Sequence, residues 1–433
     1  MRPGPWRTEF RRSLGFPFFA INAALNVWIL FVHPGWAAEW ITLVTLQRWG
    51  LIVTGSVLIT AAAWYAGRER RRSIDELINS TSLPRGRRHA LMLSTLLVGA
   101  IGGHLFAFAV AAVFVVQQSD YHGGGWWWIV LLSCLGLCLM GAVGWVIGML
   151  IPYRLTAPLA GVASYIGVGV LTFSHRDWFN LLPMGLDSVY AGSSPTGFGV
   201  AVSAAFFLLA AGGLLWLVLS ESRRTWGLVA LAGAASFAFT VPDPDTDRWW
   251  SPDPEATAPL CTNTKPTVCV WNAHAKFLEP TEAALVPVLQ RLGDEGPSSA
   301  QEWDPHRALE PDVLEIQIGN RIPLIGSDLR SSGDLRAEAA MSPLLSCYFG
   351  EGEDGSGTFW PADNAVTELL MDGLESGIPD AGDQVWRDGP DGIRRLGTAT
   401  EQQQTEFIRT YFALAHDCDI DGIERLATTW QPN

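Results

Sequence analysis

Seven stretches of this 433-residue chain are apolar enough to cross a lipid bilayer, and they restrict the folds available to it. Crossing about 30 Å of hydrocarbon takes about 20 apolar residues in a helix, and somewhat fewer where the bilayer thins. Such stretches form helices because unpaired backbone groups are costly in hydrocarbon. We expect membrane helices, roughly, at residues 15–32, 51–66, 90–116, 126–151, 158–173, 198–220 and 226–241.

Two of these stretches have an alternative interpretation. The last, 226–241, is short and rich in small residues, so a buried helix of a soluble domain would look similar. The first, 15–32, lacks a small-residue cleavage site followed by a soluble domain, so we expect it to stay as an anchor and not to act as a cleaved signal peptide. A content of 48% hydrophobic residues with 20 tryptophans favours membrane insertion.

The chain divides into two parts of opposite charge. Residues 1–241 contain 16 arginines, no lysine and 9 acids, a net charge of +7. Residues 242–433 contain 13 basic and 34 acidic residues, a net charge of −21. We therefore expect a transmembrane domain at 1–241, a linker rich in proline and acids at 242–259, and a separate domain at 260–433.

The arginines also predict the orientation, because short loops rich in Lys and Arg remain cytoplasmic. With the N-terminus in the cytoplasm, 14 of the 16 arginines of the first part fall on the inner side, leaving Arg48 and Arg176 outside. Seven spans then place residues 260–433 outside the cell. Tryptophans at 126–128 and at 249–250 would lie at the outer headgroup boundary.

The cysteines of the C-terminal part fit an oxidising compartment. They number four, an even count that is typical of two disulfides: Cys261, Cys269, Cys347 and Cys418. Of three possible pairings we favour Cys261 with Cys269 and Cys347 with Cys418, because CTNTKPTVC has the composition of a short closed loop. Zinc is the rival interpretation, but no zinc-ligand spacing supports it, and we expect no metal site.

The C-terminal domain has the pattern of a small α+β fold. EPTEAALVPVLQRL and TEFIRTYFALAH have helical periodicity, DVLEIQIGNRIPLI indicates one or two strands, and 242–259 should be extended and solvated. DCDIDGIE at 417–424 begins like a calcium loop but has Thr428 where the bidentate glutamate belongs, so we favour an acidic turn.

Polar residues within the spans have two interpretations. His104 and His175 could line a path for substrate or protons, because polar groups at membrane depth are expensive, but helix packing accounts for His104 equally well. Asn22 and Asn26 lie on one helical face, where hydrogen bonds between helices are the favoured explanation.

A basic segment at 67–90 separates the second and third spans and contains seven arginines. SIDELINS within it predicts a short helix with Ser73 as its N-cap. Three interpretations of such a segment compete: control of topology by positive charge, binding of anionic lipid headgroups, and docking of a cytoplasmic protein.

This segment, ERRRSIDELINSTSLPRGRRHALM, resembles the E-R-x-x-G-T-x-E-L-L-x-x-T-P-x-S-R segment of type-two ABC transporter permeases. The basic N-terminal stretch and the loop DWFNLLPMGLDSVYAG resemble the same family, so the likeness covers residues 1–220. The resemblance implies that 67–90 is the coupling segment. The residues expected to contact the ATPase are Glu69, Ser73, Asp75, Glu76, Leu77, Ser80, Pro84 and Arg85.

The resemblance also implies the partners. They are a separate cytoplasmic ATPase that holds ATP and magnesium, a second permease subunit, identical or related, and membrane lipid; nucleic acid is not expected. Members usually end inside after six spans, whereas this chain is expected to add a seventh and an outer domain, an addition that resembles large actinobacterial permeases of the class.

We expect no enzyme activity in this chain. It has no phosphate-binding loop, no H-E-x-x-H and no G-x-S-x-G, so ATP hydrolysis would occur on the separate subunit. The expected function is that of a permease subunit in an ATP-driven exporter. The alternative is a membrane-anchored binding or sensing protein whose spans only hold the outer domain.

Overall fold

A computed structural model of the chain describes residues 14–33, 35–72, 85–172, 181–182, 192–219, 224–240, 246–292, 297–302, 313–319, 329, 362, 365–366, 369, 390–417 and 419–431. The chain forms two compact units. Unit 1 comprises Met1–Gln117 and His122–Asp253, and unit 2 comprises Gln118–Tyr121 and Pro254–Asn433.

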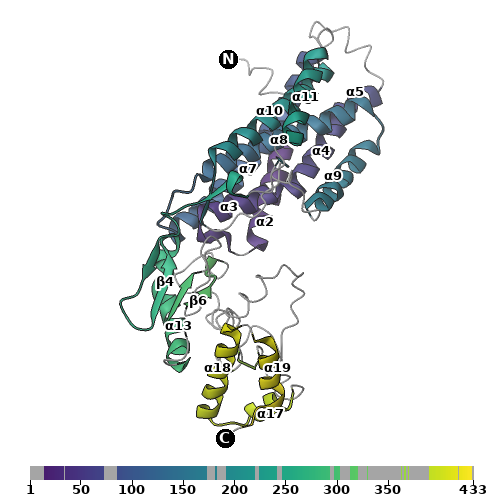
Figure 1. The fold of residues 1–433 in the computed structure, drawn as a ribbon. Coiled ribbons are helices and arrows are strands. Elements are labelled where there is room, and N and C mark those ends of the chain that lie inside the picture. Colours follow the sequence, from purple (N-terminus) through teal and green to yellow (C-terminus); the bar gives the residue numbers. More distant parts are fainter. Residues whose placement is uncertain are drawn as a thin grey trace. The chain divides into compact units, whose positions relative to one another are not determined.

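Unit 1 is helical (Figure 1). Its elements, in chain order, are α2 (Gly15–Val32), η1 (Trp36–Ala38), α3 (Trp40–Trp49), α4 (Leu51–Ala66), α5 (Arg68–Arg71), α7 (Arg85–Gln118), α8 (Trp126–Leu150), α9 (Thr156–Thr172), β1 (Ser193–Pro195), α10 (Gly197–Leu219), α11 (Arg224–Thr240), α12 (Thr246–Trp249) and β2 (Trp250–Pro252).

By length and composition, four of these helices can cross a membrane, namely α2, α7, α8 and α10. The helices α3 and α4 meet at a bend of 41° and together add a fifth candidate. The apolar helices α9 and α11 are shorter. Large apolar side chains such as Trp28, Leu159 and Val170 are more than half exposed, as lipid-facing residues are. This is the architecture of a helical multi-pass membrane protein.

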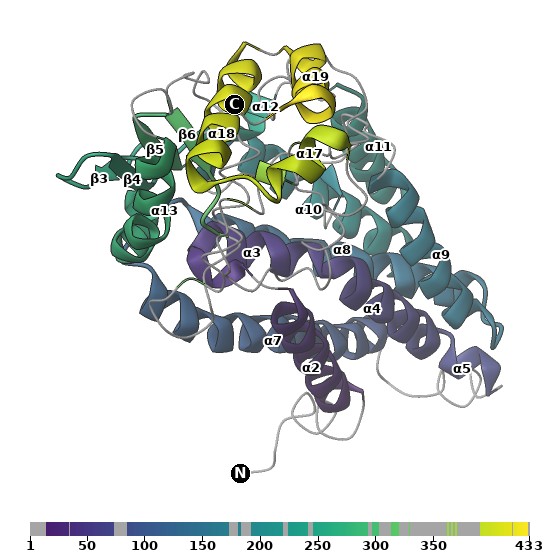
Figure 2. The same cartoon turned by 90° about the horizontal axis from the view of Figure 1, so that it is seen from below.

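Small residues allow the helices of unit 1 to approach closely. The helix α4 packs against both α8 and α9, and α10 packs against both α8 and α11. A Cβ on Gly144 of α8 would lie 2.5 Å from the carbonyl oxygen of Ile59 in α4. Figure 2 shows α2 lying across α7, where Gly103 faces the backbone of Phe19 and Ala23. Such contacts between backbones are typical of membrane helices, which associate through packing.

A two-stranded antiparallel ribbon joins the ends of the hairpin formed by α10 and α11. The strand β1 directly precedes α10, β2 follows α11 and α12, and the register pairs Ser193 with Pro252. The predicted extended linker at 242–259 is therefore wrong in its first half, which contains a helical turn and a paired strand. Trp249 and Trp250 are buried instead of facing a headgroup layer, because they pack against Ile41, Val44 and their neighbours.

Unit 2 contains a four-stranded sheet and a group of helices (Figure 1). Its elements are β3 (Pro259–Cys261), β4 (Thr267–Trp271), η3 (Asn272–Phe277), α13 (Leu278–Leu292), β5 (Ser299–Glu302), β6 (Val313–Ile316), α17 (Asp391–Leu396), α18 (Glu401–His416) and α19 (Ile420–Thr429). The helices predicted from EPTEAALVPVLQRL and TEFIRTYFALAH are confirmed. In DVLEIQIGNRIPLI the strand β6 is confirmed, and residues 320–325 lie outside the described residues.

The sheet order is β3-β4-β5-β6. The β3–β4 pair is antiparallel, whereas β4, β5 and β6 are parallel, and α13 makes the crossover between β4 and β5. Parallel strands require such a crossover and are buried on both faces. Val268, Val270, Ala300, Leu314 and Ile316 are accordingly almost fully buried.

Candidate functional site

The described part of the predicted coupling segment consists of its two ends. At one end, Gly67 follows α4 and leads into the single turn of α5, which contains Glu69. At the other end, Arg85 opens α7, although its side chain is not among the described ones. Ser73, Asp75, Glu76, Leu77, Ser80 and Pro84 lie outside the described residues.

An ion pair joins these two ends. Arg88 Nη2 in the first turn of α7 donates to Glu69 Oε2 at 2.9 Å, and the two side chains are only 11% and 9% exposed. His89 Nε2 lies 3.8 Å from the same carboxylate oxygen. Removing one member of a buried pair leaves an uncompensated charge, which is strongly destabilising. The pair therefore holds the beginning and the end of the segment against one another.

Aromatic rings pack beside His89. His89 meets Trp145 of α8 edge to face at 5.7 Å, and Trp145 meets Tyr65 of α4 in the same way at 6.2 Å. Each such contact adds about 1 kcal/mol beyond the burial of its area. The sequence indicated Glu69 through the family motif, but it gave no signal for Arg88, His89 or Trp145 as its surroundings.

Arginines on α5 cover the ends of two membrane helices. Arg70 Nη1 donates to the carbonyl oxygen of Met149 at 3.0 Å, and Arg71 Nη2 donates to the carbonyl oxygen of Trp64. The Arg71 guanidinium also lies 4.5 Å from the centroid of the Trp64 ring. Cations are favourable at the carboxyl ends of helices, where the carbonyl groups lack partners. Partial burial, then the charges of Arg154 and Arg72, lower the pKa of Arg71 below its ordinary value.

A second group of polar side chains is buried between α2, α3 and α7. Gln47 Nε2 donates to the carbonyl oxygen of His104 at 2.7 Å, and His104 Nδ1 lies 3.3 Å from Asn26 Oδ1. Asn26 in turn donates to the side chain of Asn22. Gln47 Oε1 and Asn22 Nδ2 are buried and have no hydrogen-bond partner among the described residues.

The bend between α3 and α4 adjoins this polar group. Arg48, next to Gln47, is 2% exposed, and its Nη2 donates to the carbonyl oxygen of Leu182 at 3.3 Å. The sequence placed Arg48 in an outer loop and gave no role to Gln47. Asn22, Asn26 and His104 were recognised as buried polar residues, whereas His175 lies outside the described residues.

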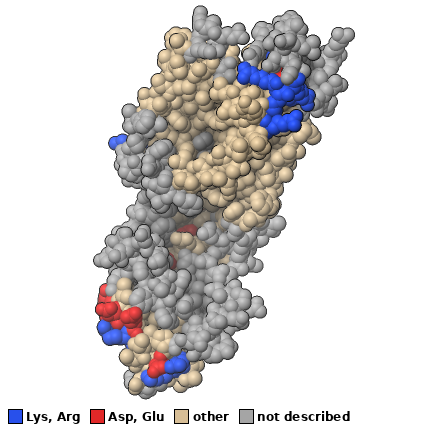
Figure 3. Space-filling model, turned by 90° about the vertical axis from the view of Figure 1, so that its right-hand side faces the viewer, with Lys and Arg blue, Asp and Glu red and all other residues tan. Residues whose placement is uncertain are grey.

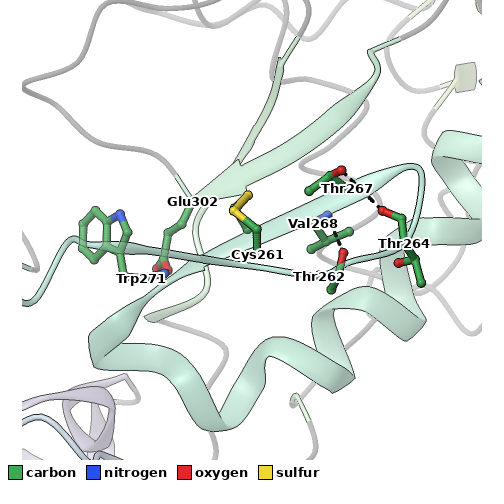
Figure 4. Close-up of a disulfide and its surroundings, with 8 residues drawn as sticks. Cys261, Thr262, Thr264, Thr267, Val268, Trp271 and Glu302 are labelled. Carbon is green, nitrogen blue, oxygen red and sulfur yellow. Dashed lines mark hydrogen bonds between the residues drawn. A yellow bond between two sulfur atoms is a disulfide. The ribbon is translucent and has the colours of Figure 1, made fainter.

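In unit 2, the predicted disulfide between Cys261 and Cys269 is present (Figure 4). It joins directly paired positions of β3 and β4. Cys347 and Cys418 lie outside the described residues. Cys134 and Cys138 of α8 are free thiols.

A buried histidine and glutamate meet at the carboxyl ends of the parallel strands. His274 Nδ1 lies 2.7 Å from Glu302 Oε1, and Glu302 Oε2 accepts the backbone N–H of Trp271 at 2.9 Å. Figure 4 shows Glu302 beside Trp271. The carboxylate thus connects the end of β5 to the end of β4. Sequence periodicity gave no signal for this contact.

The acidic turn predicted at 417–424 is only partly correct, because Asp417 and Asp419 lie between α18 and α19 whereas residues 420–424 belong to α19. Asp419 Oδ1 accepts the backbone N–H of Gly422 at 2.8 Å and so caps α19. Among the described residues there is no group of three or more His, Cys, Asp or Glu side chains that could hold a metal ion.

Comparison of the chain with protein-family models, with curated proteins and with solved structures gives no match.

Proposed function

We propose that this protein is the membrane-spanning permease subunit of an ATP-driven ABC exporter. In this proposal a separate cytoplasmic subunit binds ATP and magnesium and presses on residues 73–80 of the coupling segment. The membrane helices, paired with those of a second permease subunit, respond by alternating their opening. The N-terminus lies in the cytoplasm, the chain crosses the membrane seven times, and unit 2 lies outside the cell.

The Glu69–Arg88 ion pair is the observation that carries this proposal. A segment that receives force must be held at both ends, since a push on a loosely tethered loop is lost in the motion of the loop. Glu69 follows α4, and Arg88 belongs to α7, a helix of 34 residues. A displacement of the segment would therefore reach two membrane helices directly.

The β1–β2 ribbon supports the seven spans. The strand β1 precedes α10, and β2 follows α11. Because the two strands pair, the start of α10 and the end of the α10–α11 hairpin lie at the same depth in the membrane. The 17 residues of α11 extend about 25 Å at 1.5 Å per residue, close to the thickness of the hydrocarbon layer. On this reasoning α10 and α11 are two successive crossings.

The buried polar group supports transport. Asn22, Gln47, Arg48 and His104 are buried residues of α2, α3 and α7, which are candidate membrane helices or part of one, and they lie beside the bend of α3 and α4. Polar residues at membrane depth are rare and mark paths for ions or polar substrates, and broken helices form such sites in transporters.

Charge reversal tests the coupling. Asp75→Lys with Glu76→Lys should remove the ATP-binding subunit from complexes purified from native membranes, whereas membrane insertion should be unchanged. The matched control is Glu401→Lys with Glu406→Lys, which reverses two charges on α18 of unit 2 and should leave the complex intact. Equal recovery of the ATP-binding subunit with the wild-type protein, the charge-reversed variant and the control variant would contradict the proposal.

A membrane-anchored binding or sensing protein is the second candidate function. The observation that favours it is the separate hydrophobic core of unit 2, which would allow this unit to act as a receptor. The same purification distinguishes the two. An ATP-binding subunit in the complex supports export, and a kinase or a sigma-factor regulator in its place supports sensing.

A further inference from the structure

Five arginines gather at one end of unit 1, and we call them the arginine patch: Arg68, Arg70, Arg71, Arg72 and Arg154. Four come from α5 and the residue after it, and Arg154 comes from the turn between α8 and α9. Figure 3 shows the basic side chains of unit 1 concentrated at this end, beside uncharged surface.

The patch has an excess of positive charge. Glu69 is the one acid within 64–72 and 149–155, and it is buried and paired with Arg88 at 2.9 Å. Asp75 and Glu76 follow in the segment outside the described residues. Arg154 and Arg72 lie close enough to Arg71 for their charges to lower its pKa. Mutual repulsion of this kind is relieved when an anion binds between the guanidinium groups.

The arginines have donors to spare. Arg70 and Arg71 each donate one hydrogen bond to the carbonyl end of a helix, and a guanidinium group has five N–H donors in all. The backbone N–H of Arg72 bonds within the turn of α5, but among the described residues the guanidinium groups of Arg72 and Arg154 have neither a hydrogen bond nor an ion pair. A phosphate group, which guanidinium groups bind in a bidentate manner, fits these donors.

Exposed apolar side chains adjoin the patch. Trp64 is 46% exposed, and the turn that carries Arg154 includes Leu150, Ile151, Tyr153 and Leu155, each at least half exposed. Tryptophan and tyrosine mark the boundary between hydrocarbon and headgroups, and arginines at helix ends extend to that same level. The patch therefore combines N–H groups that can donate hydrogen bonds to a phosphate with an apolar surface that can contact acyl chains.

We infer that the arginine patch, with Trp64 and the turn 150–155, is a binding site for a phospholipid with a net negative headgroup. The lipid phosphate contacts Arg71, Arg72 and Arg154, and its acyl chains lie on the adjoining apolar side chains. This site does not depend on the proposed coupling to an ATPase, because it requires only that unit 1 is in a membrane.

The test uses the full-length protein, purified in detergent and incubated with equal amounts of phosphatidylglycerol and phosphatidylcholine. Lipids that remain bound after gel filtration are then counted by mass spectrometry. The wild-type protein should retain phosphatidylglycerol at least about fivefold over phosphatidylcholine, since each arginine near an anionic headgroup contributes about a factor of five. Excess inorganic phosphate should not displace the lipid, because phosphate lacks acyl chains.

Two variants locate the site. Arg71→Gln with Arg154→Gln should reduce the preference for phosphatidylglycerol about fivefold or more. Arg394→Gln with Arg395→Gln removes the same charge from α17 of unit 2 and should leave the preference unchanged. Arg154→Gln alone, which breaks no described hydrogen bond, keeps the test valid if the double variant misfolds.

Three results would overturn the inference. They are equal retention of the two lipids by the wild-type protein, unchanged preference in both Arg154 variants, and complete displacement of the lipid by inorganic phosphate. A fourth result would also overturn it: if the arginine variants lost a bound protein subunit but kept their lipid preference, the patch would be a protein interface instead.

Discussion

The carboxylate of Glu69 and the guanidinium group of Arg88 meet at 2.9 Å in a buried ion pair, across the 19 positions that separate them in the sequence. This contact connects the end of one membrane helix to the beginning of another. Because both side chains are almost fully enclosed, neither charge is compensated by water when its partner is lost.

Glu69→Ala should therefore destabilise unit 1 by about 3–5 kcal/mol, the usual consequence of leaving one member of a buried pair alone. Thermal unfolding of the purified protein in detergent measures the effect. Glu69→Gln with Arg88→Gln removes both charges and should recover part of the loss. Asp391→Asn, which breaks an exposed pair with Arg394, is the control and should change the midpoint little. Equal stability of Glu69→Ala and Asp391→Asn would contradict the role of the pair.

Close packing between α4 and α8 makes a second prediction. A side chain at Gly144 would meet the backbone of Ile59, whereas a side chain at Gly167 of α9 would meet nothing within 4 Å. Gly144→Val should lower the stability of the folded protein by about 1–3 kcal/mol or more, because the two backbones must separate. Gly167→Val is the matched control, and its yield and unfolding temperature should equal those of the wild type. Equal yield and equal unfolding temperature of the two variants would contradict the close contact between the backbones of α4 and α8.

In unit 2, the carboxylate of Glu302 accepts hydrogen bonds from Trp271 and from His274. Glu302→Ala leaves a buried backbone N–H and a buried imidazole without this acceptor, which should cost about 1–3 kcal/mol for each group. Hydrogen exchange of the full chain should show faster exchange in β4 and β5. Glu282→Ala, which removes an exposed hydrogen bond from Thr264, should leave that exchange unchanged. Unaltered protection of β4 in Glu302→Ala would contradict the bridging role.

The Cys261–Cys269 disulfide closes a short loop between β3 and β4. Replacing both cysteines by alanine should lower the stability of this hairpin by about 2–3 kcal/mol, the contribution expected for a loop of this length. Protection of β3 and β4 against hydrogen exchange should fall, while protection of α18 should be retained. Equal loss in β3 and α18 would mean that the bridge supports the whole of unit 2 and not the hairpin alone.

Of the seven predicted spans, 158–173 and 226–241 correspond to helices that are shorter than the candidate membrane helices. Hydropathy predicted α2, α7, α8 and α10, the four helices long and apolar enough to cross a membrane, because backbone groups in hydrocarbon leave the chain few alternatives. It missed α3, since WITLVTLQRW is short and contains Gln47 and Arg48, whose burial depends on contacts with residues far along the chain. The paired strand β2 was missed for a similar reason. Its proline and acidic surroundings indicated a linker, and only β1, more than 50 residues earlier, provides its partner.

In the candidate site, too, local features could be predicted from the sequence, whereas contacts between separate elements could not. Local composition predicted the Cys261–Cys269 bridge, because the two cysteines are separated by a short proline-containing loop. No local pattern could indicate that Arg88 faces Glu69 or that His274 faces Glu302, since each pair joins two separate elements. Contacts of this kind depend on how the helices and strands pack.

Photo-crosslinking from position 77 in native membranes identifies the protein that contacts the segment 67–90. A photoreactive amino acid in place of Leu77, within the segment that Glu69 and Arg88 enclose, should crosslink to an ATP-binding subunit. The same photoreactive amino acid in place of Trp127 should not crosslink to that subunit. Trp127 lies at the amino end of α8, whereas α5 contacts the carboxyl end of that helix. Failure of position 77 to capture an ATP-binding subunit, or equal capture from position 127, would contradict the account.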